Sequence, residues 1–257
     1  MIAGNHCSKF TLNYDTLHTI HRSIDTLATT TTAMTTPSTV LFDLDLTLCE
    51  RTQSQDELLA DSFATAGVEQ YCRPADLAAV VDDVPTATSD VEFYRFCLEA
   101  AAERLGADSA SAGAVARAYD ELLDHSAVSF LPGAEAALEL ARESGRVGLV
   151  TNGSRETQLE KLEALGIADA FDVAVYADPD NGIHPKPKTV PFERALSALN
   201  ADPDGAIHVG DSLAADVAGA HAAGLDSVWV PYDSPDEAGD HSPTHTLETL
   251  AEFETVL

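Results

Sequence analysis

VLFDLDLTL, residues 40–48, begins as a short apolar run and then carries two aspartates separated by one residue. An apolar run of this length before a polar break is typical of a strand buried in a parallel sheet. Alternate residues of a strand face the same way and the backbone turns where a strand ends, so Asp43 and Asp45 can both reach one small space beyond the tip. α/β sheets bind their ligands there. Two carboxylates in that space would repel unless a cation or a shared proton lies between them.

From Leu131 onward, helices and strands alternate along the chain. The expected strands after the first are residues 146–151, 171–176, 206–210 and 227–230, and the expected helices are residues 132–144, 154–165, 189–199, 213–223 and 247–253. Such alternation implies a parallel sheet with right-handed crossovers. The sequence therefore predicts an α/β fold with a Rossmann-like parallel-sheet core.

Residues 51–129 have a helical pattern instead, and no strand signal interrupts them. Leu59, Phe63 and Ala66 fall at helical spacing, and Gly67 and Gly106 lie where helices would end. We expect an inserted α-helical subdomain here, with the core formed by residues 39–50 and 130–257. Residues 1–38 are expected to be an N-terminal extension, disordered or a mis-assigned start, with Met34 as the true first residue and no signal peptide.

The composition is strongly acidic. The chain has 257 residues, of which 45% are hydrophobic, and a net charge of -29 from 43 acidic and 14 basic residues. We expect this surface to repel nucleic acid and anionic membranes. No apolar run approaches the length of a membrane span. Abundant carboxylates with scarce lysine resemble the composition of halophilic archaeal proteins, and an ordinary acidic mesophilic protein is the alternative.

The four cysteines form no CxxC pair, which argues against a zinc site or a disulfide framework. Reduced thiols fit a cytoplasmic location, which is our expectation.

Polar residues follow each expected strand at its carboxyl end. Asp43 and Asp45 follow the first strand, Thr151 and Asn152 the second, and Asp211 the fourth. Asp216 comes five residues after Asp211, and Lys186 lies in a loop before a helix. Because the carboxyl ends of parallel strands converge on one crevice, we expect all of these groups to meet there.

Together these groups can perform phosphoryl transfer. An aspartate can attack phosphorus, and Mg²⁺ takes oxygen ligands such as the carboxylates of Asp43 and Asp211. Lys186 would offset negative charge, and Thr151 with the Asn152 amide would donate hydrogen bonds to phosphate oxygens. Asp45 would protonate the leaving alcohol and then deprotonate the attacking water.

Four motifs resemble those of the haloacid dehalogenase-like (HAD) hydrolase superfamily, in its phosphoglycolate phosphatase-like branch. They are DLDLTL at 43–48, TNG at 151–153, Lys186-Pro187, and GDSLAAD at 210–216. The resemblance implies that Asp43 is phosphorylated, that Asp45 is the acid and base, and that Mg²⁺ is held by Asp43, the Asp45 carbonyl and Asp211, supported by Asp216. It also implies that the helical insertion is a cap that closes over the substrate.

The sequence departs from the family where Leu46 stands, since Gly or Asp is frequent there. Arg51 is either a surface residue or a contact for an anionic substrate.

The leading function is a magnesium-dependent phosphatase acting on a small phosphorylated metabolite, as a monomer or homodimer. The alternatives are a phosphomutase, a haloacid dehalogenase, and a non-catalytic regulatory module. Asp45 argues against a dehalogenase, because carbon–halogen cleavage needs no acid for its leaving group.

Overall fold

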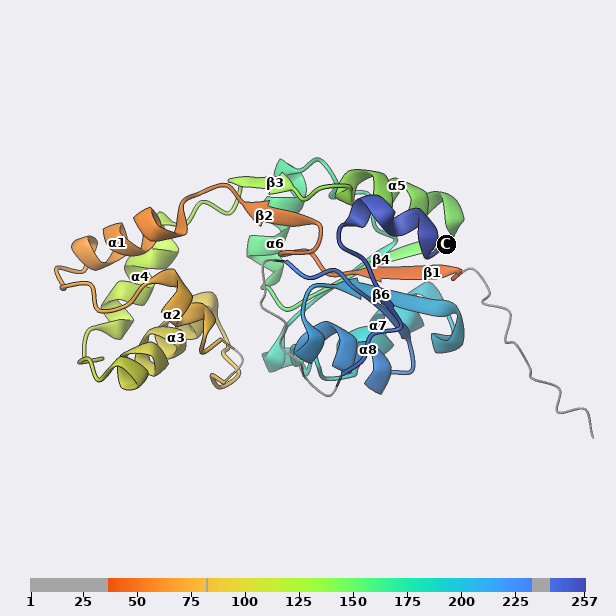
Figure 1. Cartoon of the computed structure of the whole chain (residues 1–257). Coiled ribbons are helices and arrows are strands. Elements are labelled where there is room, and N and C mark those ends of the chain that lie inside the picture. The colour runs from red at the N-terminus through yellow and green to blue at the C-terminus, as the bar shows by residue number, and fades with distance from the viewer. Residues whose placement is uncertain (1–36, 82, 233–240) are drawn as a thin grey trace, which may run out of the picture. The chain divides into compact units, whose positions relative to one another are not determined.

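The computed structural model describes residues 37–81, 83–232 and 241–257 (Figure 1). The predictions about the N-terminal extension, apart from its last two residues, and about Met34 as the first residue lie outside this part of the chain. So does Cys7. The other three cysteines, Cys49, Cys72 and Cys97, are buried and free.

A six-stranded sheet forms the centre of the fold, in the order β5-β4-β1-β6-β7-β8, and every neighbouring pair is parallel. The strands are β1 (Thr39–Phe42), β4 (Arg146–Thr151), β5 (Val173–Tyr176), β6 (Ala206–Gly210), β7 (Asp226–Trp229) and β8 (His245–Thr246). The predicted Rossmann-like parallel sheet is confirmed. β8 was not predicted, because two residues carry no readable periodicity.

Helices cover both faces of the sheet, as Figure 1 shows. One face is covered by α5 (Ala134–Ser144), α6 (Arg155–Ala164) and the 3₁₀ helix η4 (Leu250–Thr255). The other is covered by α7 (Val190–Leu199) and α8 (Ala218–Ala222), which continues a π-helical turn, η3 (Leu213–Val217). Successive residues of β1 face opposite layers, because side chains alternate along a strand. Val40 and Phe42 pack under α5 and η4, whereas Leu41 packs under α7.

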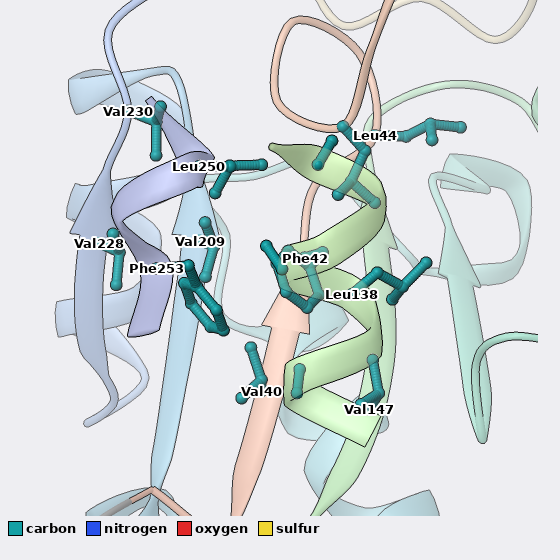
Figure 2. Close-up of a cluster of buried hydrophobic side chains, with 14 of the residues drawn as sticks. Val40, Phe42, Leu44, Leu138, Val147, Val209, Val228, Val230, Leu250 and Phe253 are labelled. Atoms are coloured by element: carbon teal, nitrogen blue, oxygen red, sulfur yellow. The ribbon is translucent and has the colours of Figure 1, made fainter. Parts of the chain in front are cut away.

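The larger core cluster lies between β1, β6 and β7 on one side and α5 with η4 on the other. Figure 2 shows Phe253 of η4 and Leu138 of α5 in one cluster with Phe42, Val209 and Val228. The rings of Phe42 and Phe253 lie 5.7 Å apart between centroids. This packing fixes the end of β1, and with it the backbone from which Asp43 projects.

Between β1 and α5 the chain forms four helices with a separate hydrophobic cluster around Phe63, Leu98 and Val115. They are α1 (Gln55–Thr65), α2 (Pro74–Ala78), α3 (Asp90–Leu105) and α4 (Ala112–Leu122). The expectation that no strand interrupts this block is wrong at its two ends. β2 (Cys49–Arg51) pairs antiparallel with β3 (Val128–Phe130), and strands of three residues are too short to show a period. The boundaries at residues 50 and 130 stay a prediction.

Within the described residues, no helix is both long and apolar enough to cross a membrane.

We expect Phe253→Ala to lower the free energy of unfolding by about 3–5 kcal/mol, because it removes a fully buried ring from the main core. Chemical denaturation at one fixed salt concentration measures this. The matched control is Leu122→Ala, whose side chain is largely exposed on α4, with an expected change within about 1 kcal/mol. Equal losses in the two variants would contradict the assignment of the core.

Candidate active site

The carboxyl ends of three adjacent strands bring the predicted residues together. β1 lies between β4 and β6 in the sheet. Asp43 follows β1, Thr151 ends β4, and Asp211 follows β6 directly. The amide of Asp43 donates to the Val209 carbonyl at 2.9 Å, so the ladder of the sheet extends to Asp43 itself.

Lys186 lies at the centre of this group and is almost fully buried. Its Nζ is 2.7 Å from Asp43 Oδ1 and 2.6 Å from Asp216 Oδ1, and it donates to the Val150 carbonyl at 2.9 Å. Burial alone would lower the pKa of Lys186, but the two carboxylates outweigh burial and raise it above its usual value. The side chain therefore stays a cation.

Three carboxylates share this space with that single ammonium group. Oxygens of Asp43, Asp211 and Asp216 all lie within 4.8 Å of one another. Burial and the charge of Asp216, against the opposing effect of Lys186, raise the pKa of Asp43 to about 7. Burial and the charges of Asp216 and Asp43 raise the pKa of Asp211 to about 8. A cluster of oxygen donors with surplus negative charge suits a hard divalent cation such as Mg²⁺.

Asp216 differs from the other two carboxylates because both of its oxygens are already hydrogen-bonded. Oδ1 contacts Lys186 and lies 2.8 Å from His208 Nε2, and Oδ2 accepts from the Ser212 amide at 3.0 Å. Burial would raise the pKa of Asp216, but Lys186 and His208 hold it below its usual range. Gly210 makes this position possible, since a Cβ there would collide with the Asp216 carboxyl group.

Asp45 is held by two residues that the sequence analysis missed. Lys161 Nζ lies 2.7 and 2.8 Å from its two carboxylate oxygens, and Gln158 Nε2 donates to Oδ2 at 2.8 Å. Burial raises the pKa of Asp45, but Lys161 and Gln158 together bring it below its usual value. Gly153 leaves the room that Gln158 needs, because a Cβ there would collide with the Gln158 amide group.

A signal for Lys161 was present in the sequence. The chain has only four lysines, and Gln158 and Lys161 are three residues apart on one helix, so they share a face. His208, a histidine inside the apolar strand β6, was a similar signal.

Thr151 and Asn152 have different surroundings. Thr151 Oγ1 accepts from Gln158 Nε2 at 3.2 Å and from the Gly153 amide at 3.3 Å. The Asn152 side chain bonds to the backbone of Lys186 instead: its Oδ1 accepts from the Lys186 amide at 2.7 Å and its Nδ2 donates to the Lys186 carbonyl at 3.3 Å. Asn152 thus fixes the loop that carries Lys186.

Leu46 has φ +58°, a left-handed conformation that leucine rarely adopts, and its side chain is 37% exposed. Gly and Asn or Asp adopt this conformation at lower cost.

A cavity of about 870 Å³ opens over these groups. Asp45, Lys161 and Lys186 line it, and so do residues of the helical insertion and of β2, among them Arg51, Tyr94 and His125. The volume falls in the range of small-molecule sites.

Comparison with known proteins gives a consistent set of relatives. A family model for haloacid dehalogenase-like hydrolases matches residues 37–224. Ribulose-1,5-bisphosphate 5-phosphatase of Halopiger xanaduensis is 35% identical over 135 residues, which is 49% of this chain and 56% of the relative. Pyrophosphatase PpaX of Halalkalibacterium halodurans is 27% identical over 219 residues, 84% of this chain and 94% of the relative. The match to the first of these relatives therefore spans little more than half of its length.

A solved structure shows the same fold. The HAD-hydrolase YfnB from Bacillus subtilis, in a crystal form bound to magnesium, superposes with a TM-score of 0.67 at 22% identity, covering 87% of this chain and 99% of YfnB.

We expect Lys186→Met to lower the free energy of unfolding in metal-free buffer by about 3–5 kcal/mol, because it leaves two buried carboxylates without their shared cation. Denaturant titrations in EDTA measure this loss. Lys188→Met is the control. It removes the same charge from a side chain that lies two residues further along and is exposed, so it should change the free energy of unfolding by less than about 0.5 kcal/mol. An equally stable Lys186→Met protein would show that the ion pairs do not hold the site together.

Proposed function

Because this chain belongs to the haloacid dehalogenase-like hydrolase family, we propose that it is a magnesium-dependent phosphatase that hydrolyses a small phosphorylated metabolite through an aspartyl-phosphate. The observation that carries the proposal is the buried cluster in which Asp43 meets Lys186 and two further carboxylates at the end of β1. The relatives named phosphatases support the reaction class, and they act on different substrates by name.

Asp43 is the proposed nucleophile. Its carboxylate attacks phosphorus, the ester P–O bond breaks, and the alcohol leaves with a proton. Lys186, 2.7 Å from Asp43 Oδ1, offsets the charge of the nucleophile and of the phosphoryl group. The hydrogen bond from the Asp43 amide to the Val209 carbonyl of β6 holds the backbone of Asp43 in place, and so orients its carboxylate for attack.

Asp45 is the proposed acid and base. Its pairing with Lys161 favours the ionised form, which is the form that takes a proton from the water attacking the aspartyl-phosphate. In the first half-reaction the protonated form of Asp45 gives its proton to the oxygen of the leaving alcohol, while Lys161 and Gln158 hold its carboxyl group in position. The second half-reaction returns that proton, so the cycle balances.

Thr151 and Asn152 are proposed to serve the phosphate. The Thr151 oxygen accepts two hydrogen bonds, so its own proton remains to donate to a phosphate oxygen. The backbone amide of Asn152 is the predicted second donor, while its side chain positions Lys186.

Asp43 and Asp211 are the proposed carboxylate ligands of Mg²⁺, with the Asp45 backbone carbonyl as the third protein ligand that the family resemblance implies. Bound there, Mg²⁺ would supply positive charge that offsets the carboxylates and the phosphate. Asp216 is a supporting residue in this proposal rather than a direct ligand, because its oxygens already contact Lys186, His208 and the Ser212 amide.

The rival functions are separated by Asp45 and by assay. A dehalogenase has no need for a protonated leaving group, whereas here Lys161 and Gln158 hold Asp45 in place. A phosphomutase would use the same residues and would return phosphate to a sugar rather than release it. A regulatory module would show no turnover.

The cytoplasmic location and a monomeric or homodimeric state remain predictions.

We expect wild-type protein with Mg²⁺ in high salt to hydrolyse p-nitrophenyl phosphate, and Asp43→Asn to abolish release of p-nitrophenol, because an amide is not a nucleophile toward phosphorus. Asp204→Asn, an exposed substitution of the same kind, should keep wild-type activity. Circular dichroism of each variant confirms the fold. Full activity of a folded Asp43→Asn protein would exclude the mechanism.

We further expect Mg²⁺ to stabilise the wild-type protein by about 2.7 kcal/mol at a hundred times its dissociation constant. Thermal unfolding with EDTA and with Mg²⁺ measures this. Asp211→Asn should lose most of the increase in Tm, because it removes one proposed ligand. Asp204→Asn should keep it. An Mg²⁺-induced increase that survives in Asp211→Asn would place the ion elsewhere.

A further inference from the structure

Basic side chains outnumber carboxylates among the residues that line the cavity, although the chain as a whole is acidic. The net charge of the chain is -29. Yet the cavity is lined by all the lysines that the structure describes, together with Arg51, against only two carboxylates, Asp45 and Asp90. The lysines are Lys161, Lys186 and Lys188. The described lysines and one arginine thus lie around the space proposed for the substrate.

Two of these cations have carboxylate partners, whereas Arg51 and Lys188 form no ion pair among the described residues. Lys186 pairs with Asp43 and Asp216, and Lys161 pairs with Asp45. Arg51 lies on β2, is only partly exposed, and has no carboxylate within ion-pair distance among the described residues. A half-buried guanidinium without an anion is costly unless a ligand supplies one.

The charge of Asp45 acts on Arg51 without an ion pair between them, and two other neighbours of Arg51 are uncharged phenols. Tyr94 on α3 and Tyr119 on α4, whose rings lie 4.8 Å apart between centroids, are near enough for the charge of Arg51 to act on their phenols. Burial raises the pKa of both tyrosines. The phenols therefore stay neutral and do not compensate the charge of Arg51.

His125 also lines the cavity and has a buried nitrogen that lacks a hydrogen-bond partner. The residue follows α4, and the nitrogen without a partner is Nδ1. Burial lowers the pKa of His125, and the charges of Lys161 and Arg51 lower it further, while Glu160 and Asp90 oppose them. The imidazole is thus neutral at pH 7, lies close to both cations, and can still donate one N–H.

We propose that Arg51 and His125 form a second anion-binding subsite, which takes an oxyanion on the leaving group of the substrate. This inference rests on the proposed phosphatase function, with the phosphoryl group at Asp43. A guanidinium binds carboxylate or phosphate through two parallel N–H bonds, and both anions share this chemistry. The substrate class is then a phosphate monoester that carries a carboxylate or a second phosphate, rather than a neutral sugar or alcohol phosphate.

Non-hydrolysable phosphonates test the subsite by binding alone. Isothermal titration at constant free Mg²⁺ would compare phosphonoacetate and 3-phosphonopropionate with ethylphosphonate and propylphosphonate, which lack the carboxylate. Ethane-1,2-diylbisphosphonate replaces the carboxylate by a second phosphonate. The same ligands would be titrated into wild type, Arg51→Gln, Arg51→Lys and Arg142→Gln, the last removing an exposed arginine of α5 that does not line the cavity.

We expect wild type to bind at least one type of ligand with two anionic groups about tenfold or more tightly than the alkylphosphonate of the same length. This is the gain expected from a charge-assisted hydrogen bond. Arg51→Gln should bring this ratio close to one, Arg51→Lys should keep part of it, and Arg142→Gln should keep all of it. A preference for the carboxylates or for the bisphosphonate identifies which anion the subsite takes.

Two outcomes would overturn the subsite. One is an equal affinity of wild type for the ligands with two anionic groups and for the alkylphosphonates, a result that wild-type protein alone can give. The other is an Arg51→Gln protein that weakens both ligand types equally, as expected if Arg51 only ties Tyr94 and Tyr119 to β2. Failure of the phosphatase function is a separate result, seen as no hydrolysis of any ester by wild type with Mg²⁺.

Discussion

The ion pairs of Lys186 with Asp43 and Asp216 are the interaction on which the rest of the site depends. Buried carboxylates at the end of a sheet repel one another, and a single ammonium group cannot neutralise all of them. The surplus negative charge fits a divalent cation. The loop of Lys186 is fixed by Asn152, and Gly210 leaves space for the Asp216 carboxyl group, so neighbouring strands all serve this one arrangement.

The sheet and the meeting of the four motifs could be predicted from the sequence, because both follow from local patterns. β4 and β6 have the predicted bounds, since each is a buried run between clear helix signals. Polar residues that end parallel strands must share one edge of the sheet. β2, β3 and β8 were missed because two or three residues cannot show a period, and their pairing depends on the partner strand.

The contacts of Lys161 and Gln158 with Asp45 could not be predicted, because they depend on how α6 is rotated against β1. A hydrophilic helix such as RETQLEKLEA offers a weak apolar stripe, so the sequence does not show that Gln158 and Lys161 face inward. The structure places both beside Asp45, more than a hundred residues earlier in the chain. The same holds for Asp216, whose oxygens are engaged in ways that only the tertiary packing reveals.

The acidic surface and the cationic cavity act in opposite directions on an anionic substrate. The net charge of -29 repels phosphate esters at low salt, whereas salt reduces that repulsion over distances beyond roughly 10 Å. Contacts inside the cavity are shorter and partly shielded from water, so screening weakens them much less. High salt would then remove the barrier to approach while leaving the attraction of Arg51 and Lys188 in the cavity. A chain so rich in carboxylates can therefore bind a polyanion, provided that some of its few basic residues line the cavity.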